Sequence, residues 1–290
     1  MMLSMLINGL SVGAVYSMIA VGFALIFSVM KFSNFAHGGM IAVSAYIGFF
    51  ASKWFHTNLF LTLLIAMVGG GITGLVVELI GFRRMRGKNS PLIYYFISSI
   101  TIGMLLENIL TLINGTNFYT FPTFIQLYSF DVFGFMVNIM DCIMMGVTVV
   151  SLLTLLYIFR CTRLGLAIRA VSLDNRTSRL CGINSTVVVM AAFFIAGALA
   201  GICGVLLGIN YTVYPQLSQM VVKGFIASVL GGLGSLGGAV VGALLLGVIE
   251  VFVTVIFGAG LTPVFSFGII ILFLLIRPQG IAGVIVSEKA

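Results

Sequence analysis

Charged residues are scarce in this sequence. They make up 7% of its 290 residues, whereas a typical soluble domain carries about 25%. So few charges cannot cover a water-exposed surface, which leaves no room for a separate soluble domain. The apolar runs are continuous and do not alternate, which excludes a transmembrane β-barrel. The composition, 61% hydrophobic, therefore predicts an all-α polytopic membrane protein with a single transmembrane domain over residues 1–290.

Cysteine and histidine are also few. The 4 cysteines form no CxxC pair, and the 2 histidines, His37 and His56, lie far apart with no HExxH or GxSxG motif. We therefore expect no disulfide framework, no metal site and no hydrolytic site. The stretch 232–237 matches GxGxxG, but a dinucleotide fold needs alternating strands and helices in water, which the apolar flanks exclude. We expect no enzyme activity and no bound cofactor, ATP included, in this chain.

What the sequence does contain is a series of long apolar segments. A helical crossing of a bilayer needs about 20 apolar residues, so the sequence predicts about eight transmembrane helices. Most of them are expected at 3–30, 39–52, 59–81, 91–113, 136–158, 187–210 and 262–276. Between two of these helices, residues 114–135 are expected to form an exposed loop rich in aromatic residues.

The segment 224–258 is too long for one plain crossing and carries a glycine cluster at 231–238. We interpret it as a broken pair: a short membrane helix, an unwound glycine-rich break, and a full span that bears Glu250. Unwound backbone survives at membrane depth only where it is buried in protein or lines a cavity. Transporters place such breaks at their binding sites, so this break is a candidate for function.

Glycine pairs at GxxxG-like spacing occur in other predicted helices as well. Examples are Gly9 with Gly13 and Gly70 with Gly74. In lipid, helices associate by close packing, and small residues at this spacing let two backbones approach each other. For these glycines we favour a packing role over a functional one.

Basic residues gather in two segments, 83–88 and 160–184, which lie between apolar spans. Cytoplasmic loops carry an excess of Lys and Arg, so both segments are expected on the cytoplasmic side, the first of them as a turn. Basic loops of this kind orient membrane proteins and need no partner to explain them. The net charge of +7 therefore indicates topology and not nucleic-acid binding.

The 160–184 segment is longer than a connector requires. Apolar residues at i, i+3, i+4 and i+7 predict one face of a short helix: Leu164, Ala167, Ile168 and Val171. Asp174 can cap a second short helix, and Gly182 can end that helix in a left-handed conformation. This helix–cap–helix organisation favours a docking surface over a mere connector.

Several polar side chains lie within or near the predicted spans. They are Asn34, His37, Glu78, Glu107, Asn108, Asp141 and Glu250. Such groups cost free energy in hydrocarbon and are candidates for function. Each can instead reach water at a helix end or make a packing hydrogen bond, and we favour that interpretation for Glu78 and Asp141. Asn34 and His37 can equally hold together the turn before a helix.

Four sequence blocks, in order, resemble one protein family. They are NFAHG at 34–38, TRLG and AIRA within 162–170 followed by Gly182, GGLGS at 231–235 followed by Glu250, and RPQG at 277–280. In these blocks the chain resembles the inner-membrane permease subunits of ABC importers for branched-chain amino acids, the Liv type. Its length and short N-terminus resemble the smaller of the two permeases in such systems. It departs from the family pattern at Leu166, Thr177 and Ser178, within the central segment.

The resemblance implies partners and site residues. A periplasmic binding protein would deliver leucine, isoleucine or valine, a second permease subunit would complete the pathway, and two ATPase subunits would hydrolyse ATP and dock on 160–184. The implied ATPase-coupling residues are Thr162, Arg163, Gly165, Ala167, Arg169, Ala170, Asp174 and Gly182. The candidates for the pathway or its gating are Asn34, His37, Glu107, Asn108, Gly231, Gly232, Gly234, Ser235 and Glu250.

Other functions stay open on the sequence. Relatives with similar motifs handle urea or short amides. A secondary transporter would couple to protons or Na⁺ through Glu107 or Glu250, without an ATPase. A channel would show passive flux, and a scaffolding subunit would leave uptake unchanged when deleted. The folded basic segment favours the ABC permease, a multi-pass protein in contact with the lipid of a bacterial or archaeal inner membrane.

Overall fold

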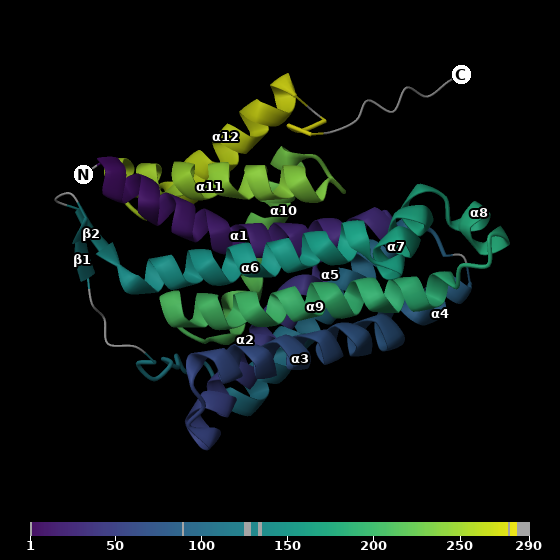
Figure 1. Ribbon diagram of the computed structural model, residues 1–290, viewed down its shortest axis with the longest axis horizontal. Coiled ribbons are helices and arrows are strands. Elements are labelled where there is room, and N and C mark those ends of the chain that lie inside the picture. The colour runs from purple at the N-terminus through teal and green to yellow at the C-terminus, as the bar shows by residue number, and fades with distance from the viewer. Residues whose placement is uncertain (1, 89, 125–128, 133–134, 278, 283–290) are drawn as a thin grey trace. The chain divides into compact units, whose positions relative to one another are not determined.

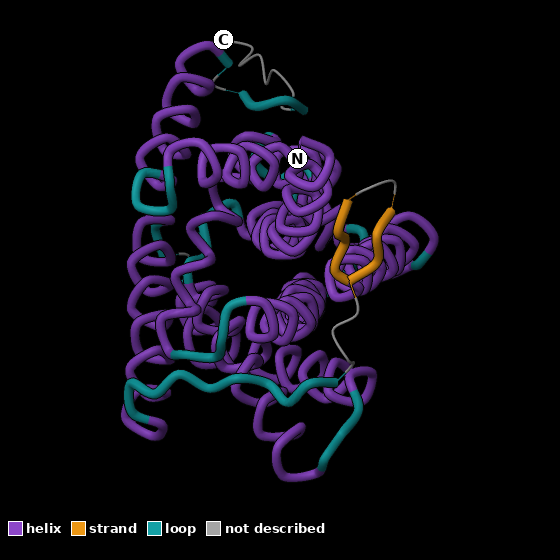
Figure 2. The backbone as a smooth tube through the Cα atoms, turned by 90° about the vertical axis from the view of Figure 1, so that its left-hand side faces the viewer, coloured by secondary structure: helices purple, strands orange, loops and turns teal. Residues whose placement is uncertain are grey.

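The computed structural model describes residues 2–88, 90–124, 129–132, 135–277 and 279–282. Helices dominate this part of the chain, as Figure 1 and Figure 2 show. The chain separates into two compact units: a first unit of Met1–Ala24, Leu127–Val149 and Lys223–Ala290, and a second unit of Leu25–Gln126 and Val150–Val222. The division falls inside helices α1 (Met2–Met30) and α6 (Ile139–Cys161), so both helices contribute to both units.

The first unit holds most of α1, the beginning of α6 and three C-terminal helices. The C-terminal helices are α10 (Val221–Gly231), which belongs to this unit from Lys223 onward, α11 (Leu236–Phe257) and α12 (Thr262–Ile276). Helices α1 and α11 approach closely, because a Cβ atom on Gly13 would lie 2.9 Å from the Cα of Leu244, and one on Gly9 would lie 2.8 Å from the Cα of Val248. These facing pairs make the two helices antiparallel and confirm the predicted packing role of Gly9 and Gly13.

The first unit also contains a short hairpin, drawn in orange in Figure 2. Strands β1 (Ser129–Val132) and β2 (Phe135–Asn138) pair antiparallel, with Ser129 opposite Asn138. The sequence predicted an exposed loop over 114–135 and a span over 136–158, and it did not anticipate these two strands, which lie in that loop and at the start of that span. Their aromatic and β-branched residues favour extended backbone. Residues 125–128 and 133–134 of the same predicted loop lie outside the described residues.

Helices α10 and α11 form an antiparallel hairpin. Gly231 packs against Gly238, and Gly242 packs against Ala227. Residues 232–235 between the two helices are not helical. Within them Gly232 has a φ of 102° and Gly234 a φ of 85°, conformations that residues with a Cβ atom rarely adopt. The glycines therefore permit both the turn and the close contact of the two helices behind it.

The segment after α12 returns to the end of α10. The N–H of Ile281 donates to the carbonyl of Leu230 at 2.9 Å, and the N–H of Ala282 donates to the carbonyl of Gly231 at 3.0 Å. These two carbonyls belong to the last turn of α10, where no partner exists within the helix. Gly280 has a φ of 77°, and this left-handed conformation lets the chain turn back toward the end of α10. The two residues that follow the RPQG block thus satisfy the end of α10, with Gly280 of that block beside them; Pro278 of the block lies outside the described residues.

The second unit contains most of the remaining helices. They are α2 (Ala36–Phe55), α3 (Leu59–Val77), the π-helix η1 (Glu78–Phe82), α4 (Arg83–Gly87), α5 (Leu92–Asn114), the end of α6, α7 (Arg163–Leu173), α8 (Asn175–Leu180), α9 (Ser185–Asn210) and the 3₁₀-helix η2 (Pro215–Met220).

Helices α3 and α9 lie side by side in Figure 1 and meet at glycines. Gly70 faces Gly197, Gly74 faces Phe193, and Gly201 faces Ala66, so the helices run antiparallel. A Cβ atom on Gly70 would lie 2.9 Å from the Cα of Gly201. Helix α2 packs against both of them. The predicted packing role of Gly70 and Gly74 is confirmed.

Six helices of the described chain are long and apolar enough to cross a membrane. They are Met5–Met30, Leu59–Gly87, Leu92–Asn114, Ile139–Cys161, Ser185–Asn210 and Leu236–Phe257. The prediction of a turn at 83–88 is wrong, because α3 continues through η1 and α4 to Gly87. A salt bridge of 2.6 Å between Arg86 and Glu78 joins the two ends of this helical extension. Glu78 is buried and does not reach water, so of the two local roles that we favoured for it the structure shows the packing interaction, here with Arg86.

Candidate functional site

The 160–184 segment folds as two short helices, each with a side-chain cap. The hydroxyl of Thr162 accepts a hydrogen bond of 3.1 Å from the Gly165 N–H at the start of α7. Asp174 caps α8 by accepting from the Thr177 hydroxyl and, at 2.8 Å, from the Arg176 N–H. These hydrogen bonds, the Thr177 one foremost, hold the pKa of the Asp174 carboxyl below its ordinary value. The predicted helix–cap–helix organisation is confirmed.

The end of α8 also follows the prediction. Gly182 has a φ of 82° just beyond the helix, and the Ile183 N–H donates to the Ser178 carbonyl at 3.1 Å. This is the left-handed helix ending that favours glycine. Gly165 has a different role. A Cβ atom there would collide with the carbonyls of Ile158 and Phe159, so only glycine lets α7 fold back onto the end of α6.

The two helices bury one face and expose another. Ile168 and Val171 of the predicted apolar stripe are buried, while Leu164 at its beginning is 38% exposed. Leu173 and Leu180 are 87% and 89% exposed. Sequence reasoning missed both leucines. The available signal was one leucine in the last position of each short helix, outside the predicted apolar stripe.

The arginines of the segment differ in their surroundings. Arg163 and Arg176 are exposed, and the Nε of Arg179 donates to the Ser185 hydroxyl at 2.7 Å. Arg169 is half-buried, and its guanidinium donates to the carbonyl of Phe159 at the end of α6. Arg169 therefore holds the segment itself together, and Ala167 and Ala170 beside it are also half-buried.

The NFAHG block forms the start of α2. The Asn34 side chain accepts a hydrogen bond of 3.1 Å from the Ala36 N–H, so it holds the turn before the helix. His37 is fully buried. Gly38 lies against the carbonyl of Ser218, whose hydroxyl donates to the Glu107 carboxylate. The fold therefore brings the NFAHG block and Glu107 together.

Other polar candidates have local partners. The Asn108 side chain is exposed and donates to the Met104 carbonyl at 2.8 Å, within its own helix. The Asp141 carboxylate accepts from the Ser11 hydroxyl at 3.2 Å, a packing hydrogen bond of the kind we favoured for it. In the glycine-rich break, the hydroxyl of Ser235 accepts from the Gly238 N–H at 3.1 Å and so caps α11.

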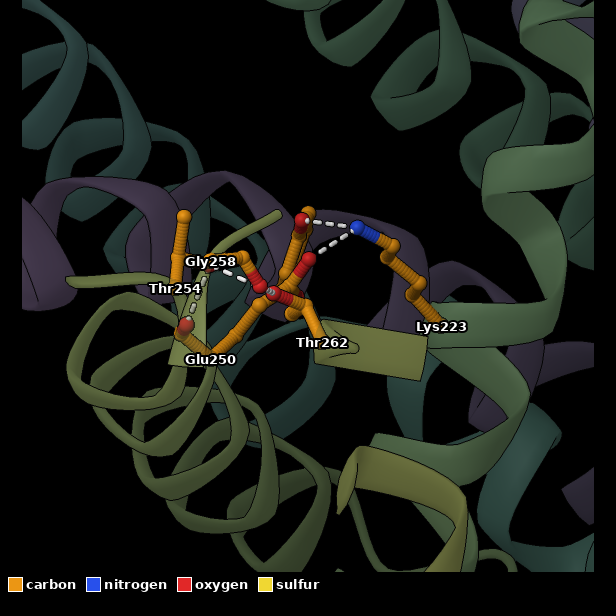
Figure 3. A network of polar contacts seen from close by, with 6 residues as sticks. Lys223, Glu250, Thr254, Gly258 and Thr262 are labelled. Carbon is orange, nitrogen blue, oxygen red and sulfur yellow. Dashed lines mark hydrogen bonds and ion pairs between the residues drawn. The ribbon is translucent and has the colours of Figure 1, made fainter. Parts of the chain in front are cut away.

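Glu250 forms an ion pair with Lys223, a residue that sequence reasoning did not single out. The Lys223 ammonium also donates to the Tyr16 hydroxyl at 2.8 Å and lies 5.1 Å from the centre of the Tyr16 ring. Figure 3 shows the Lys223 side chain pointing to Glu250. The backbone carbonyl of Glu250 accepts from the Thr254 hydroxyl at 2.7 Å. The available signal was Lys223 itself, a single charged residue in the apolar stretch before the glycine cluster at 231–238.

Comparison with known proteins decides the family. The model of the family described as "Branched-chain amino acid transport system / permease component" matches residues 5–275. This chain belongs to that family. It is a permease, and its apolar helices make it a multi-pass membrane protein.

Three relatives match the permease over most of their length. The high-affinity branched-chain amino acid transport system permease protein BraD of Pseudomonas aeruginosa is 34% identical, over 97% of this chain and 95% of BraD. LivH of Escherichia coli strain K12 is 31% identical over the same shares. The probable branched-chain amino acid transport permease protein LivH of Methanocaldococcus jannaschii is 29% identical, over 92% of this chain and 88% of that protein.

A solved structure shares the fold of the permease. It is described as PsaBC from Streptococcus pneumoniae in complex with Fab, and its TM-score to this chain is 0.51. The similarity covers 94% of this chain and 91% of that one, at 14% sequence identity. The same fold therefore also occurs in a protein whose sequence is only 14% identical to this chain.

Proposed function

We propose that this chain is the membrane-spanning permease subunit of an ATP-driven importer in a bacterial or archaeal inner membrane. It forms the translocation pathway for leucine, isoleucine and valine. The observation that carries this proposal is the family match over residues 5–275, with relatives named for branched-chain amino acid transport. The permease itself binds no ATP, and a separate partner chain hydrolyses it.

The 160–184 segment supports the ATPase part of the proposal. Leu173 and Leu180 are almost fully exposed, beside the exposed Arg163 and Arg176. Burying one leucine side chain is worth about 1.5–3 kcal/mol, and the basic residues put this segment on the cytoplasmic side. An ATPase subunit that covers both leucines gains this free energy, and its closure on ATP binding pushes on α7 and α8.

The membrane arrangement follows from helix lengths. The six long helices cross the bilayer, and α2 and α12 add two crossings, which gives about eight. Helix α10, with 11 residues, rises about 16 Å, half of the hydrocarbon core of about 30 Å. We infer that α10 and α11 are the predicted broken pair. A second permease subunit completes the pathway, and a periplasmic binding protein delivers the substrate to the outer face.

The proposal is tested by reconstitution. The permease is purified with the chains that accompany it, placed in liposomes with ATP on the ATPase side, and supplied with the binding protein and labelled leucine. ATP-dependent leucine uptake that unlabelled valine competes with, and urea does not, is expected. Leucine uptake that needs an ion gradient and no ATP would contradict the proposal in favour of a secondary transporter, and competition by urea would change the substrate class.

A further inference from the structure

The Lys223–Glu250 ion pair joins α10 to α11. Both residues and Tyr16 belong to the first unit, so this geometry lies within one compact body. Lys223 lies eight residues before the end of α10 at Gly231, and Glu250 lies fourteen residues after the start of α11 at Leu236. At 1.5 Å per residue the two lie about 12 Å and about 21 Å from the α10–α11 turn. Tyr16 lies eleven residues after the start of the span Met5–Met30, and Glu250 lies seven residues before the end of the span Leu236–Phe257, so the pair lies inside the apolar part of both helices.

Neither charge is fully covered by protein. The side chain of Lys223 is 32% exposed and that of Glu250 is 16% exposed. Charged groups at this depth face the interior of a helix bundle or a water-filled cavity, since exposure to hydrocarbon costs free energy. Tyr16 supplies a hydroxyl and an aromatic ring to the ammonium. The open side of the pair is therefore expected to meet a polar environment, which is water, a polar ligand or a polar group of the second permease subunit.

We propose that Lys223 and Glu250 form the subsite where the translocated amino acid exchanges its charges, an inference that rests on the proposed function. A free amino acid carries one ammonium and one carboxylate. The carboxylate of Glu250 takes the substrate ammonium, and the ammonium of Lys223, held by the Tyr16 hydroxyl, takes the substrate carboxylate. When the substrate leaves, the two side chains pair again.

This exchange explains why a pair of opposite charges stands here. A lone lysine or glutamate at this place would be unpaired whenever the pathway is empty. Because the two side chains neutralise each other, neither charge is unpaired before or after passage. The substrate replaces one salt bridge by two, and the weak net gain lets it leave. The class of ligand that fits is a zwitterion, and a neutral solute such as urea has no charge to exchange.

A purely structural pair makes a different prediction. Replacing a buried ion pair by well-packed apolar residues is often neutral or stabilising, while removing only one partner is destabilising. The informative variant is therefore the double substitution Lys223→Met with Glu250→Leu, which removes both charges and keeps similar volumes. The matched control is Arg86→Met with Glu78→Leu, which removes the other salt bridge of the described chain in the same way.

The experiment measures leucine uptake and ATP hydrolysis together in the reconstituted complex. The Lys223→Met/Glu250→Leu variant should assemble with its partner subunits, and leucine uptake is expressed per ATP hydrolysed so that a change in the ATPase rate alone does not affect the result. The leucine uptake per ATP of this variant should fall by at least about tenfold, since one lost charge-assisted hydrogen bond of about 1.5 kcal/mol corresponds to that factor. The Arg86→Met/Glu78→Leu variant should keep its uptake.

Each outcome decides something. Wild-type uptake per ATP in the Lys223→Met/Glu250→Leu variant overturns the subsite. If that variant does not assemble, Lys223→Gln/Glu250→Gln, a neutral pair that can hydrogen-bond, is tested in its place. Failure of both to assemble shows a structural pair, or a contact with the second permease, and also overturns the subsite. A wild-type complex without ATP-driven leucine uptake overturns the proposed function instead, which the same assay shows before any variant is used.

Discussion

Asp174 is a single residue on which the shape of the 160–184 segment depends, because it caps α8. We predict that Asp174→Ala speeds amide hydrogen exchange across 175–180, since the Arg176 N–H and the Thr177 hydroxyl lose their acceptor. Asp174→Asn should exchange like the wild type, because asparagine caps equally well. Equal exchange in all three proteins would contradict this role.

The same carboxyl gives the cap a pH dependence. Its folded-state pKa lies below the ordinary value of 3.8, so the ionised form is favoured in the folded segment. The stabilisation is therefore complete above the ordinary pKa and is lost as the pH falls through the lower, folded pKa. Exchange of α8 in the Asp174→Asn variant should lack this acid transition.

The family resemblance implies that Arg163 and Arg169 both contact an ATPase subunit, but the structure gives the two side chains different surroundings. Arg163→Glu should weaken binding of the ATPase subunit and leave the chain's melting temperature unchanged, because Arg163 is exposed. Arg169→Glu should lower that temperature as well, because its guanidinium holds the Phe159 carbonyl. Pull-down of the ATPase and thermal unfolding in detergent measure the two effects. A fully stable Arg169→Glu variant would show that this internal hydrogen bond is dispensable.

Lys223 shows the limit of reading single residues from sequence. Glu250 was a candidate because a carboxylate within an apolar helix needs an explanation. Its partner is 27 residues away and meets it only because the chain turns back at 232–235. The sequence signals that such a charge needs a partner, whereas the identity of that partner depends on the tertiary fold.

At the scale of whole helices, the contact between α3 and α9 requires their two backbones to pack directly against each other at glycines. Gly70→Ala should destabilise the protein by about 1–3 kcal/mol, the usual cost of overpacking, because its Cβ atom would meet the backbone of Gly197 and Gly201. Gly146→Ala in α6 is the matched control, since no atom lies within 4 Å of the added Cβ. Thermal unfolding of the two variants should differ in this direction; equal midpoints would refute the close contact.

The elements also show which local patterns could be predicted. The caps at Asp174 and Gly182 depend on neighbouring residues, so the sequence was sufficient for α7 and α8. The helical extension to Gly87 depends on Arg86 meeting Glu78 eight residues earlier, and the spacing of apolar residues does not reveal such a pair. The β1–β2 hairpin likewise depends on cross-strand pairing. Caps formed by adjacent residues were therefore predictable, whereas pairings between residues three to nine positions apart were not.

For the whole molecule, the test concerns assembly. Leu173→Ser with Leu180→Ser should reduce ATPase-subunit binding by at least about tenfold, because two leucine side chains no longer leave water on docking. Lys88→Ser, an exposed substitution in the other basic segment, should bind normally. Binding of the purified ATPase subunit to each permease variant in nanodiscs gives the comparison. Undiminished binding by the double variant would place the docking surface elsewhere.

The hydrogen bonds from Ile281 and Ala282 to the end of α10 have a practical consequence for anyone who engineers this protein. A purification tag or a fluorescent protein is commonly fused in place of the last residues of a chain. Here a cut before Gly280 would delete the donors for Leu230 and Gly231 and leave two carbonyls bare at a turn that two helices share. A fusion should therefore start after Ala282. If a clone truncated before Gly280 fails to express, the cause is the damaged turn and not toxicity of the tag.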